Sequence, residues 1–332
     1  MPPRQSFSEK LIAWQRRAGR KDLPWQGSRD PYRIWLSEVM LQQTQVSAVI
    51  PYFERFLARF PDVAALAAAS EEEVLERWSG LGYYARGRNL HAAARIIAKQ
   101  GFPGDSSSIE RLPGVGRSTA AAIAAFAFGE RAAILDGNVR RVLARHAGIA
   151  GFPGDKKVEA KLWALAEQRL PAKHIETYTQ ALMDLGATVC VRTPRCEACP
   201  VAKTCVARKK RLTQKIPAPR PRKDLPVKQA TWFVFVHKGE VLLERRPSSG
   251  LWGGLWTFPE REPQGITLSS RRELAPLEHG FTHFRLKIQP VLCQALRKPG
   301  RVDEPGGMWI DIEDAAGAAV PAPVRALLER IA

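Results

Sequence analysis

The chain of 332 residues is long for one domain, which predicts two domains. It carries 51 Lys and Arg residues against 33 Asp and Glu, a formal net charge of +18 at pH 7. Because phosphates attract cations placed against them, this charge indicates a nucleic-acid partner, the alternative being a merely basic protein. The N-terminus lacks the apolar region of a signal peptide, and the longest apolar stretch, Ala120–Phe128, is too short to cross a bilayer. These features argue against a secreted or membrane protein and predict a soluble, cytoplasmic one.

The N-terminal part of the sequence, residues 7–206, has helical character almost throughout. Ser70 and Glu73 have the spacing of a capping box and predict a helix start. Two glycines then interrupt the pattern before a helix expected over 84–99. Further helices are predicted around 117–128, 138–147, 156–169 and 174–187.

The composition then changes. Residues 208–228 are rich in Lys, Arg and Pro, which predicts an extended cationic linker. Beyond it, 231–237 and 240–244 flank a Lys-Gly turn and predict a β-hairpin. Strand character continues over 281–296, and 320–331 is predicted to be a closing helix. Helices followed by strands indicate an α+β multidomain protein.

A Leu-Pro-Gly-Val-Gly turn over 112–116 precedes an alanine-rich helix. Its two glycines, Gly114 and Gly116, allow backbone N–H groups at the helix start to hold a phosphate oxygen. Such contacts position DNA without reading its sequence. The alternative is a tight turn between helices with no ligand, but the positive charge of the chain favours phosphate binding.

Two carboxylates are candidates for chemistry. At helical spacing Glu38 has mostly apolar neighbours, so its carboxyl should lose hydration, hold a proton near neutral pH and act as a general acid. The alternative is an ordinary helical Glu at the core edge. Asp136 precedes an amphipathic helix, where Asp is a common N-cap. Their long separation in sequence leaves open whether the two carboxylates meet.

Four cysteines lie close together in the sequence, with no histidine between them: Cys190, Cys196, Cys199 and Cys205. Four thiolates suit either Zn²⁺ or an iron–sulfur cluster, and zinc sites more often use two separated Cys-x-x-Cys pairs. The spacing therefore favours iron–sulfur. Cys293 stands alone in a strand and is predicted to be a core residue.

Taken together, the hairpin turn, the Asp that follows it and the cysteine loop resemble the endonuclease III superfamily of helix–hairpin–helix DNA glycosylases. Within this superfamily, the chain is similar to the adenine-specific MutY family. Four motifs of the N-terminal part and two motifs of the C-terminal part, which resembles the recognition domain of that family, carry the similarity. These motifs occupy 23–25, 35–44, 80–86 and 135–139, and then 249–256 and 281–283. The resemblance covers nearly the whole chain.

The resemblance implies a fold of two parts. An all-α helix–hairpin–helix glycosylase core with an iron–sulfur loop would occupy 1–207, followed after the linker by a Nudix-like α/β recognition domain over 229–332. Within the core, a six-helix barrel would span approximately 26–136, and the cluster domain would combine 1–25 with 137–207.

The resemblance also implies an activity, the hydrolysis of the N-glycosidic bond of adenine mispaired with 8-oxoguanine or G during base excision repair. The enzyme would be monofunctional, bind double-stranded DNA as a monomer in the bacterial cytoplasm, and flip the adenine out of the stack. Glu38 would protonate adenine N7, Asp136 would stabilise the oxocarbenium charge, and Asn138 would help to position these groups.

The remaining site residues also follow from the resemblance. The DNA phosphate would be held by Leu112, Gly114, Val115, Gly116 and Ser118. The adenine pocket would be formed by Leu23, Trp25 and Gln180. The duplex would be opened and the opposite base touched by Gln43, Thr44, Leu81, Tyr83, Phe281, Thr282 and His283. A [4Fe–4S] cluster would be bound by Cys190, Cys196, Cys199 and Cys205.

Two positions depart from the family pattern. Family members usually have six residues between the first two cysteines, and this chain has five between Cys190 and Cys196. The loop of the first ligand must therefore be tighter. The recognition loop commonly carries Ser where this chain has Thr282, which keeps the hydroxyl and adds a methyl group.

Three rival functions remain. A bifunctional glycosylase/lyase for oxidised pyrimidines needs a lysine amine, and the position that carries it in such enzymes is Ser118 here. A Nudix-type hydrolase needs a helix with several Mg²⁺-binding glutamates, whereas 271–278 has one Arg-Glu pair and a proline. Non-catalytic DNA binding survives only if Glu38 or Asp136 lies outside the cleft.

Overall fold

The computed structural model describes residues 5–221, 224–248, 250–263, 265–298 and 306–332. The chain divides into two compact units. The first comprises Met1–Ala67 and Ala92–Arg222, and the second comprises Ala68–His91 and Lys223–Ala332. Ser249, at the start of one recognition motif, and two residues of the predicted linker, 222–223, lie outside the described residues.

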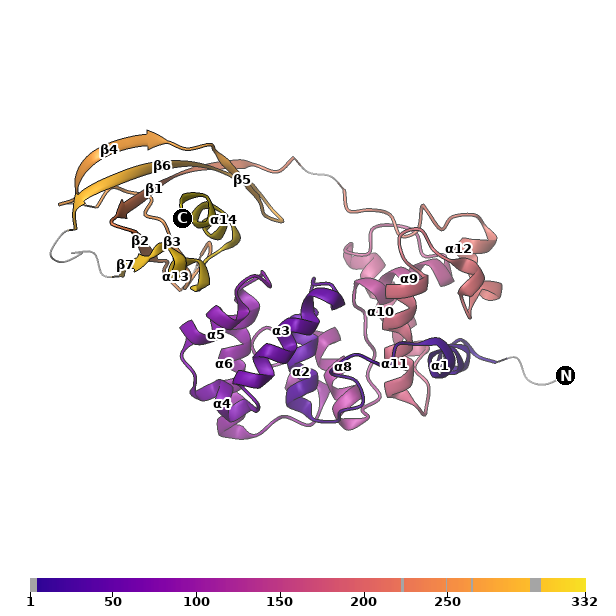
Figure 1. Ribbon diagram of the computed structural model, residues 1–332. Helices are drawn as coiled ribbons and strands as arrows, with labels where there is room; N and C mark the ends of the chain where they lie inside the picture. The colour runs from indigo at the N-terminus through magenta and orange to yellow at the C-terminus, as the bar shows by residue number, and fades with distance from the viewer. Residues whose placement is uncertain (1–4, 222–223, 249, 264, 299–305) are drawn as a thin grey trace. The chain divides into compact units, whose positions relative to one another are not determined.

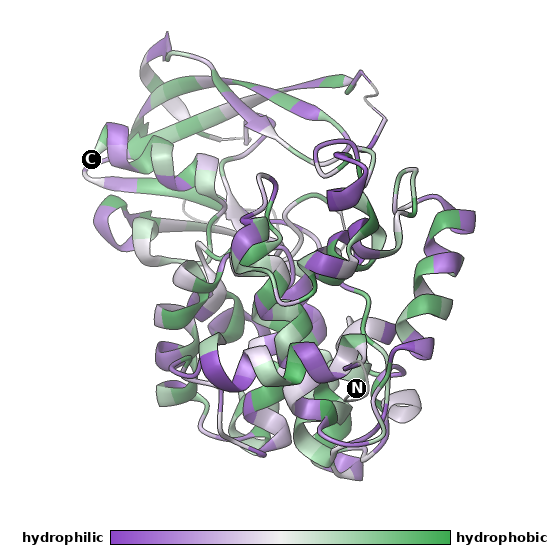
Figure 2. Cartoon of the chain, turned by 90° about the vertical axis from the view of Figure 1, so that its right-hand side faces the viewer, coloured by the Kyte–Doolittle hydropathy of each residue, from purple (hydrophilic) through white to green (hydrophobic). Residues whose placement is uncertain are grey.

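The first unit is helical (Figure 1). Along its helices hydrophobic and hydrophilic residues alternate, as expected of helices that bury one face (Figure 2). Its helices are α1 (Phe7–Ala18), α2 (Pro31–Met40), α3 (Val46–Arg59), α7 (Ser106–Ile109), α8 (Arg117–Phe128), α9 (Gly137–Ala147), α10 (Lys156–Gln168), α11 (Ile175–Asp184) and α12 (Val206–Lys209). Helices α4 (Val63–Ala68) and α6 (Ala85–Gln100) have residues in both units.

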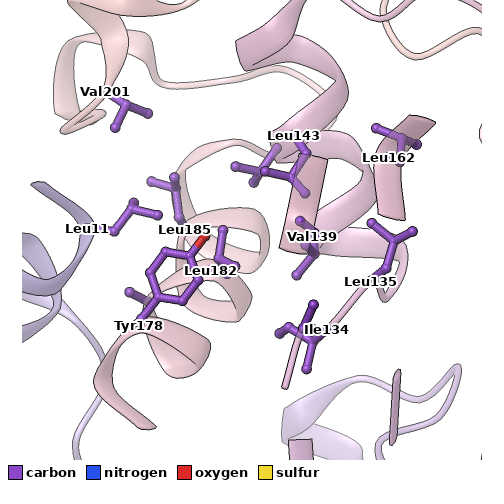
Figure 3. Close-up of a cluster of buried hydrophobic side chains, with 14 of the residues drawn as sticks. Leu11, Ile134, Leu135, Val139, Leu143, Leu162, Tyr178, Leu182, Leu185 and Val201 are labelled. Carbon is purple, nitrogen blue, oxygen red and sulfur yellow. The ribbon is translucent and has the colours of Figure 1, made fainter. Parts of the chain in front are cut away.

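A hydrophobic core joins α1, α9, α10 and α11 of the first unit (Figure 3). Each helix contributes side chains from one face, because residues three or four apart lie on the same side of a helix. The fully or nearly fully buried members include Leu11, Val139, Leu143, Leu162, Tyr178 and Leu182. Because α9 and α11 share this core, the position of one helix relative to the other is fixed.

The second unit is built on a mixed sheet. Its strands in the described residues are β1 (Val227–His237), β2 (Glu240–Arg245), β3 (Trp256–Thr257), β4 (Thr267–Glu273), β5 (Leu277–Gly280), β6 (Arg285–Arg297) and β7 (Gly307–Asp311). The strand order is β3-β2-β1-β6-β4, with β5 paired to β6 and β7 to β2. Among the strands that the structure describes, only the pairing of β1 with β6 is parallel. Its helices are α5 (Glu71–Trp78), α13 (Ile312–Gly317) and α14 (Ala322–Ile331).

Alternation along β1 divides the second unit into two layers. Trp232 and Val234 belong to one cluster, which includes residues of α13 and α14. Phe233 and Phe235 belong to the cluster on the opposite face. This is the two-residue period of a strand buried on both faces. Cys293 is fully buried in the second cluster, which confirms the prediction of a core residue.

Most predicted elements are present, with shifts at their ends. The helix predicted over 174–187 ends at Asp184 and continues as a π-helical turn, Leu185–Val189. The predicted linker is shorter, because α12 extends to Lys209 and β1 begins at Val227. β1 starts early because β6 offers it a parallel partner as far back as Arg285. Among the described residues, no helix is long and apolar enough to cross a membrane.

Candidate active site

The two candidate carboxylates lie in one cavity of the first unit. Glu38 comes from α2 and Asp136 from the N-cap of α9, and both line a cavity of about 170 Å³. Asn138, Gln180, Leu23, Trp25, Thr44 and Ser118 line the same cavity. The structure thus brings together residues that are far apart in the sequence.

Glu38 has the electrostatic environment of a general acid. Burial raises the pKa of its carboxyl to about 8, and the negative charge of Asp136 adds to the rise. Both effects disfavour the ionised form. Glu38 is therefore mostly protonated at neutral pH, in a cavity where it can deliver the proton.

Asp136 is both a helix cap and a cavity residue. Its Oδ1 accepts a hydrogen bond of 2.7 Å from the backbone N–H of Val139, which caps α9. Burial raises the pKa of Asp136, while the N–H groups of Val139 and Asn138 and the charge of Arg141 oppose the rise. Because one carboxylate oxygen is enough for the cap, the other remains able to face a positive charge in the cavity.

Asn138 is held by a residue that the sequence did not single out. Arg141 donates hydrogen bonds to Asn138 Oδ1 at 2.7 Å, to Gly186 O at 2.8 Å and to Cys190 O at 2.7 Å. A Cβ atom on Gly186 would lie 2.5 Å from Asn138 Cβ, so only glycine permits this approach. The start of α9 and the segment that leads to the first cysteine are therefore locked together.

Gln180 and Trp25 border a second, larger cavity. This cavity of about 390 Å³ shares Arg20, Trp25, Glu38 and Gln180 with the first, so the four residues stand between the two spaces. Trp25 is buried and packs edge-on against Phe53, with ring centroids 5.4 Å apart. The indole of Trp25 and the amide of Gln180 thus both line the predicted adenine pocket.

The predicted phosphate-binding hairpin lies between α7 and α8. Gly114 has a φ of 76°, a left-handed conformation that favours glycine. Gly116 is the N-cap of α8, and no side chain caps the helix. Leu112 and Val115 are buried and anchor the turn. The first backbone N–H groups of α8 are thus free of a side-chain cap, as phosphate binding requires.

Ser118 differs in its surroundings from the other predicted phosphate ligands. It lines the cavity of Glu38 and Asp136, and its Oγ accepts a hydrogen bond of 2.9 Å from the N–H of Leu135. The place where a lyase would need an amine is therefore occupied by a hydroxyl, which is bonded to the residue that precedes Asp136 in the sequence.

Two residues predicted to enter the duplex have unusual backbone conformations. Gln43, between α2 and α3, has a φ of 58°, and Tyr83, between α5 and α6, has a φ of 50°. Left-handed backbone is uncommon outside glycine and is often found at functional sites. Tyr83 is 51% exposed, whereas its neighbour Leu81 is buried.

Arg86 supports the loop of Tyr83 and was missed by sequence reasoning. It is buried and donates to the carbonyl oxygens of Gly82 at 3.1 Å and Leu81 at 3.4 Å. Its guanidinium carbon lies 5.3 Å from the ring centroid of Tyr83. Burial lowers the pKa of Arg86 to about 10, so it remains charged. The available signal was its place as the last residue of the motif over 80–86.

The predicted recognition residues lie in a turn between β5 and β6. The N–H of Phe281 donates to Phe284 O at 2.8 Å, and the two rings stack with centroids 4.4 Å apart. Trp252 packs against Phe281 at 5.6 Å. Thr282 and His283 are exposed. The aromatic rings thus fix a turn that presents two polar side chains to solvent.

The four clustered cysteines line one cavity of the first unit. Arg145 is buried beside them and donates to the carbonyl oxygens of Val191 at 2.6 Å, Arg192 at 3.0 Å and Ile216 at 2.8 Å. In the described residues no group of three or more His, Cys, Asp or Glu is arranged to hold a metal ion. Four thiols around one cavity are a donor set that is consistent with an iron–sulfur cluster.

The chain is similar to known DNA repair proteins. Residues 36–168 match the family model of the HhH-GPD superfamily base excision DNA repair proteins, and 231–330 match that of the NUDIX domain. The chain is 36% identical to the adenine DNA glycosylase of Buchnera aphidicola subsp. Acyrthosiphon pisum, over 97% of both chains. It is 32% identical to the Homo sapiens adenine DNA glycosylase, over 95% of this chain and 72% of the human one.

A solved structure supports the same class. A thermostable thymine-DNA glycosylase superposes with a TM-score of 0.55 and 29% identity, covering 61% of this chain and 95% of the other. The helical fold and the paired carboxylates therefore define a helix–hairpin–helix base excision repair protein. Within this class, the chain belongs to the adenine DNA glycosylase family. The predicted family and the α+β fold class are confirmed.

Proposed function

We propose that the protein is a monofunctional DNA glycosylase that hydrolyses the N-glycosidic bond of adenine mispaired with 8-oxoguanine or G. The observation that carries the proposal is the pair of carboxyls in one cavity, with a pKa of about 8 at Glu38. Glu38 is thus protonated, while Asp136 lies in the same cavity in a different electrostatic environment. Cleavage of a glycosidic bond needs such a pair of carboxyl groups. Family membership supports adenine as the base.

The reaction divides between the two carboxyls. A flipped adenine in the cavity receives the proton of Glu38 at its ring nitrogen, which makes the base a better leaving group. As the bond to the sugar breaks, positive charge develops on the sugar. The carboxylate of Asp136, held by the N–H of Val139, stabilises this charge, and a water molecule completes hydrolysis. Asn138, bonded to Arg141, keeps the start of α9 in place.

DNA is held by several surfaces. The uncapped start of α8 holds a phosphate, with Gly114 and Gly116 allowing the close approach. Gln43 and Tyr83 enter the duplex from strained backbone positions. In the second unit, Thr282 and His283 contact the base opposite the adenine. These roles favour a helical catalytic region over 1–207 and a recognition domain over 229–332, and within the first of these ranges Ala68–His91 belongs to the second compact unit.

We propose further that Cys190, Cys196, Cys199 and Cys205 hold a [4Fe–4S] cluster. When bound, such a cluster supplies structural cross-linking and the capacity for electron transfer. Arg145 orders the segment between the first two cysteines by donating to the backbone carbonyls of Val191 and Arg192. Purified protein should be brown, with about four iron and four sulfide per chain. A colourless, active protein with one zinc would contradict the assignment.

The activity is tested with duplexes that contain adenine opposite 8-oxoguanine, adenine opposite G, an oxidised pyrimidine, or no lesion. Free adenine should be released from the first two, and strand cleavage should appear only after alkali, because Ser118 cannot form an imine. Release of oxidised pyrimidine with spontaneous cleavage would favour the bifunctional alternative. Binding of all four duplexes without base release would favour a non-catalytic protein.

A further inference from the structure

Asp184, the last residue of α11, is a buried carboxylate that the catalytic mechanism does not use. Its side chain is fully buried. One oxygen, Oδ2, accepts from the side chain of Gln15 at 2.9 Å and from the backbone N–H of Arg20 at 2.9 Å. The other, Oδ1, accepts from the guanidinium of Arg20 at 2.8 and 2.6 Å.

The same oxygen Oδ1 also accepts a hydrogen bond of 2.9 Å from Nε2 of Gln180. Gln180 lies one helical turn before Asp184 on α11 and lines both cavities. Gln15, Arg20 and Gln180 all donate to the side chain of Asp184, so both of its oxygens act as acceptors. Gln180 must therefore turn its NH₂ group towards Asp184, which directs its carbonyl oxygen to the cavity.

We propose that Asp184 is a positioning residue that sets the base specificity of the cavity through Gln180. An amide oxygen fixed in this way accepts from a base with an exocyclic amine and repels one with a keto oxygen at the same position. Adenine carries the amine, and hypoxanthine carries the keto oxygen. The guanidinium of Arg20 bonds the same oxygen and prevents the carboxylate from turning away. This inference rests on the proposed function.

The test is single-turnover excision by the full chain from duplexes with adenine, unsubstituted purine or hypoxanthine opposite 8-oxoguanine. The parent should release adenine fastest and hypoxanthine slowest. In Asp184→Asn, the new amide can donate as well as accept, so Gln180 can turn over. The ratio of adenine to hypoxanthine excision should then fall about tenfold or more, as expected when a matched hydrogen bond loses its polarity. A folded Asp184→Asn protein with the parental ratio overturns the proposal.

A double variant separates positioning from a merely structural role. Asp184→Asn with Gln180→Glu exchanges the amide and the carboxylate, so an acceptor oxygen again faces the cavity. The adenine preference should return towards the parental ratio. If Asp184 serves only folding, the double variant should be at least as impaired as the single one, and that result overturns the proposal.

Two further variants complete the test. Gln15→Met removes a donor from the same carboxylate but leaves Gln180, so it should keep the parental ratio; a fall like that of Asp184→Asn would show general loosening and overturn the proposal. If Asp184→Asn fails to fold, Gln180→Met is the deciding variant. It keeps the ion pair of Asp184 with Arg20 but removes the amide that Asp184 holds, so the preference for adenine over hypoxanthine must be lost. A parent that releases no adenine refutes the proposed function, whereas release with an unchanged ratio in the variants refutes only the role of Asp184.

Discussion

The proposed catalytic cavity and the proposed recognition turn use polar residues in opposite ways. In the cavity, Glu38 is withdrawn from water and its pKa rises to about 8. In the turn, Thr282 and His283 are exposed, and the aromatic rings of Phe281 and Phe284 supply the order. Proton transfer benefits from low dielectric and fixed dipoles, whereas contact with a base needs side chains that the duplex can reach.

Small changes in the cavity should therefore cause large losses of excision rate. Changes in the turn should cause modest losses of discrimination between opposite bases. A cavity residue changes a rate through transition-state charge, while a turn residue changes a hydrogen bond to a base. Variants that keep shape and remove charge or protons distinguish the two regions.

The largest effect is expected for Glu38→Gln. The amide keeps the shape of the side chain but cannot deliver a proton, so adenine excision should fall by about 10² to 10⁴-fold while duplex binding persists. Single-turnover kinetics and a binding titration measure the two quantities. Glu54→Gln, an exposed change on α3, is the control and should retain activity. A rate near that of the parent would remove Glu38 from the role of acid.

Asp136→Asn should come next, with excision reduced by about 10² to 10³-fold. A neutral amide cannot balance a cationic sugar, yet Asn caps helices about as well as Asp, so the melting temperature should change little. The matched control is Asp155→Asn, which alters the N-cap of α10 away from the cavity. Equal rates for the two variants would return Asp136 to the role of a cap alone.

The pH dependence of the rate should be smaller but diagnostic. Excision needs protonated Glu38, and its pKa is about 8. The single-turnover rate should therefore fall about tenfold per pH unit above that value. A rate that is level from pH 7 to 10, with the protein still folded, would contradict this protonation state.

In the recognition turn, Thr282→Ala with His283→Ala should cost about 1–3 kcal/mol of discrimination between 8-oxoguanine and G opposite adenine. The rate of adenine release from the two duplexes measures it. The fragment 1–207 should lose the same preference and retain some excision. If both proteins keep the parental preference, the turn does not read the lesion.

The smallest effect concerns stability. The pKa of Glu38 is raised in the folded state, so its contribution to stability is complete below the unfolded pKa of 4.5 and is lost as pH rises towards about 8. Glu38→Gln removes this loss and should therefore raise the free energy of unfolding more at pH 8 than at pH 5. Denaturant titrations at the two pH values measure it. An equal gain at both would assign the effect to packing.

Local patterns in the sequence predicted much of the fold. The helix over 117–128 matches α8 in full, because an alanine-rich segment between glycines can form little else. The strands β4 and β5 were not foreseen, because β4 is mostly exposed and lacks the alternation that marks a buried strand. The early start of β1 depends on pairing with β6, which no local pattern contains.

By itself, the sequence determined the order of motifs, the cysteine set and the class of chemistry, because these depend on residue types at fixed spacing. Only the tertiary structure decided that Glu38 and Asp136 share a cavity, and that Asp184 holds the amide of Gln180. The pKa of Glu38 likewise depends on burial and on a charge from another helix. Contacts between distant residues arise from tertiary packing, such as the core that α9 and α11 share. Helical periodicity does not predict which distant residues meet.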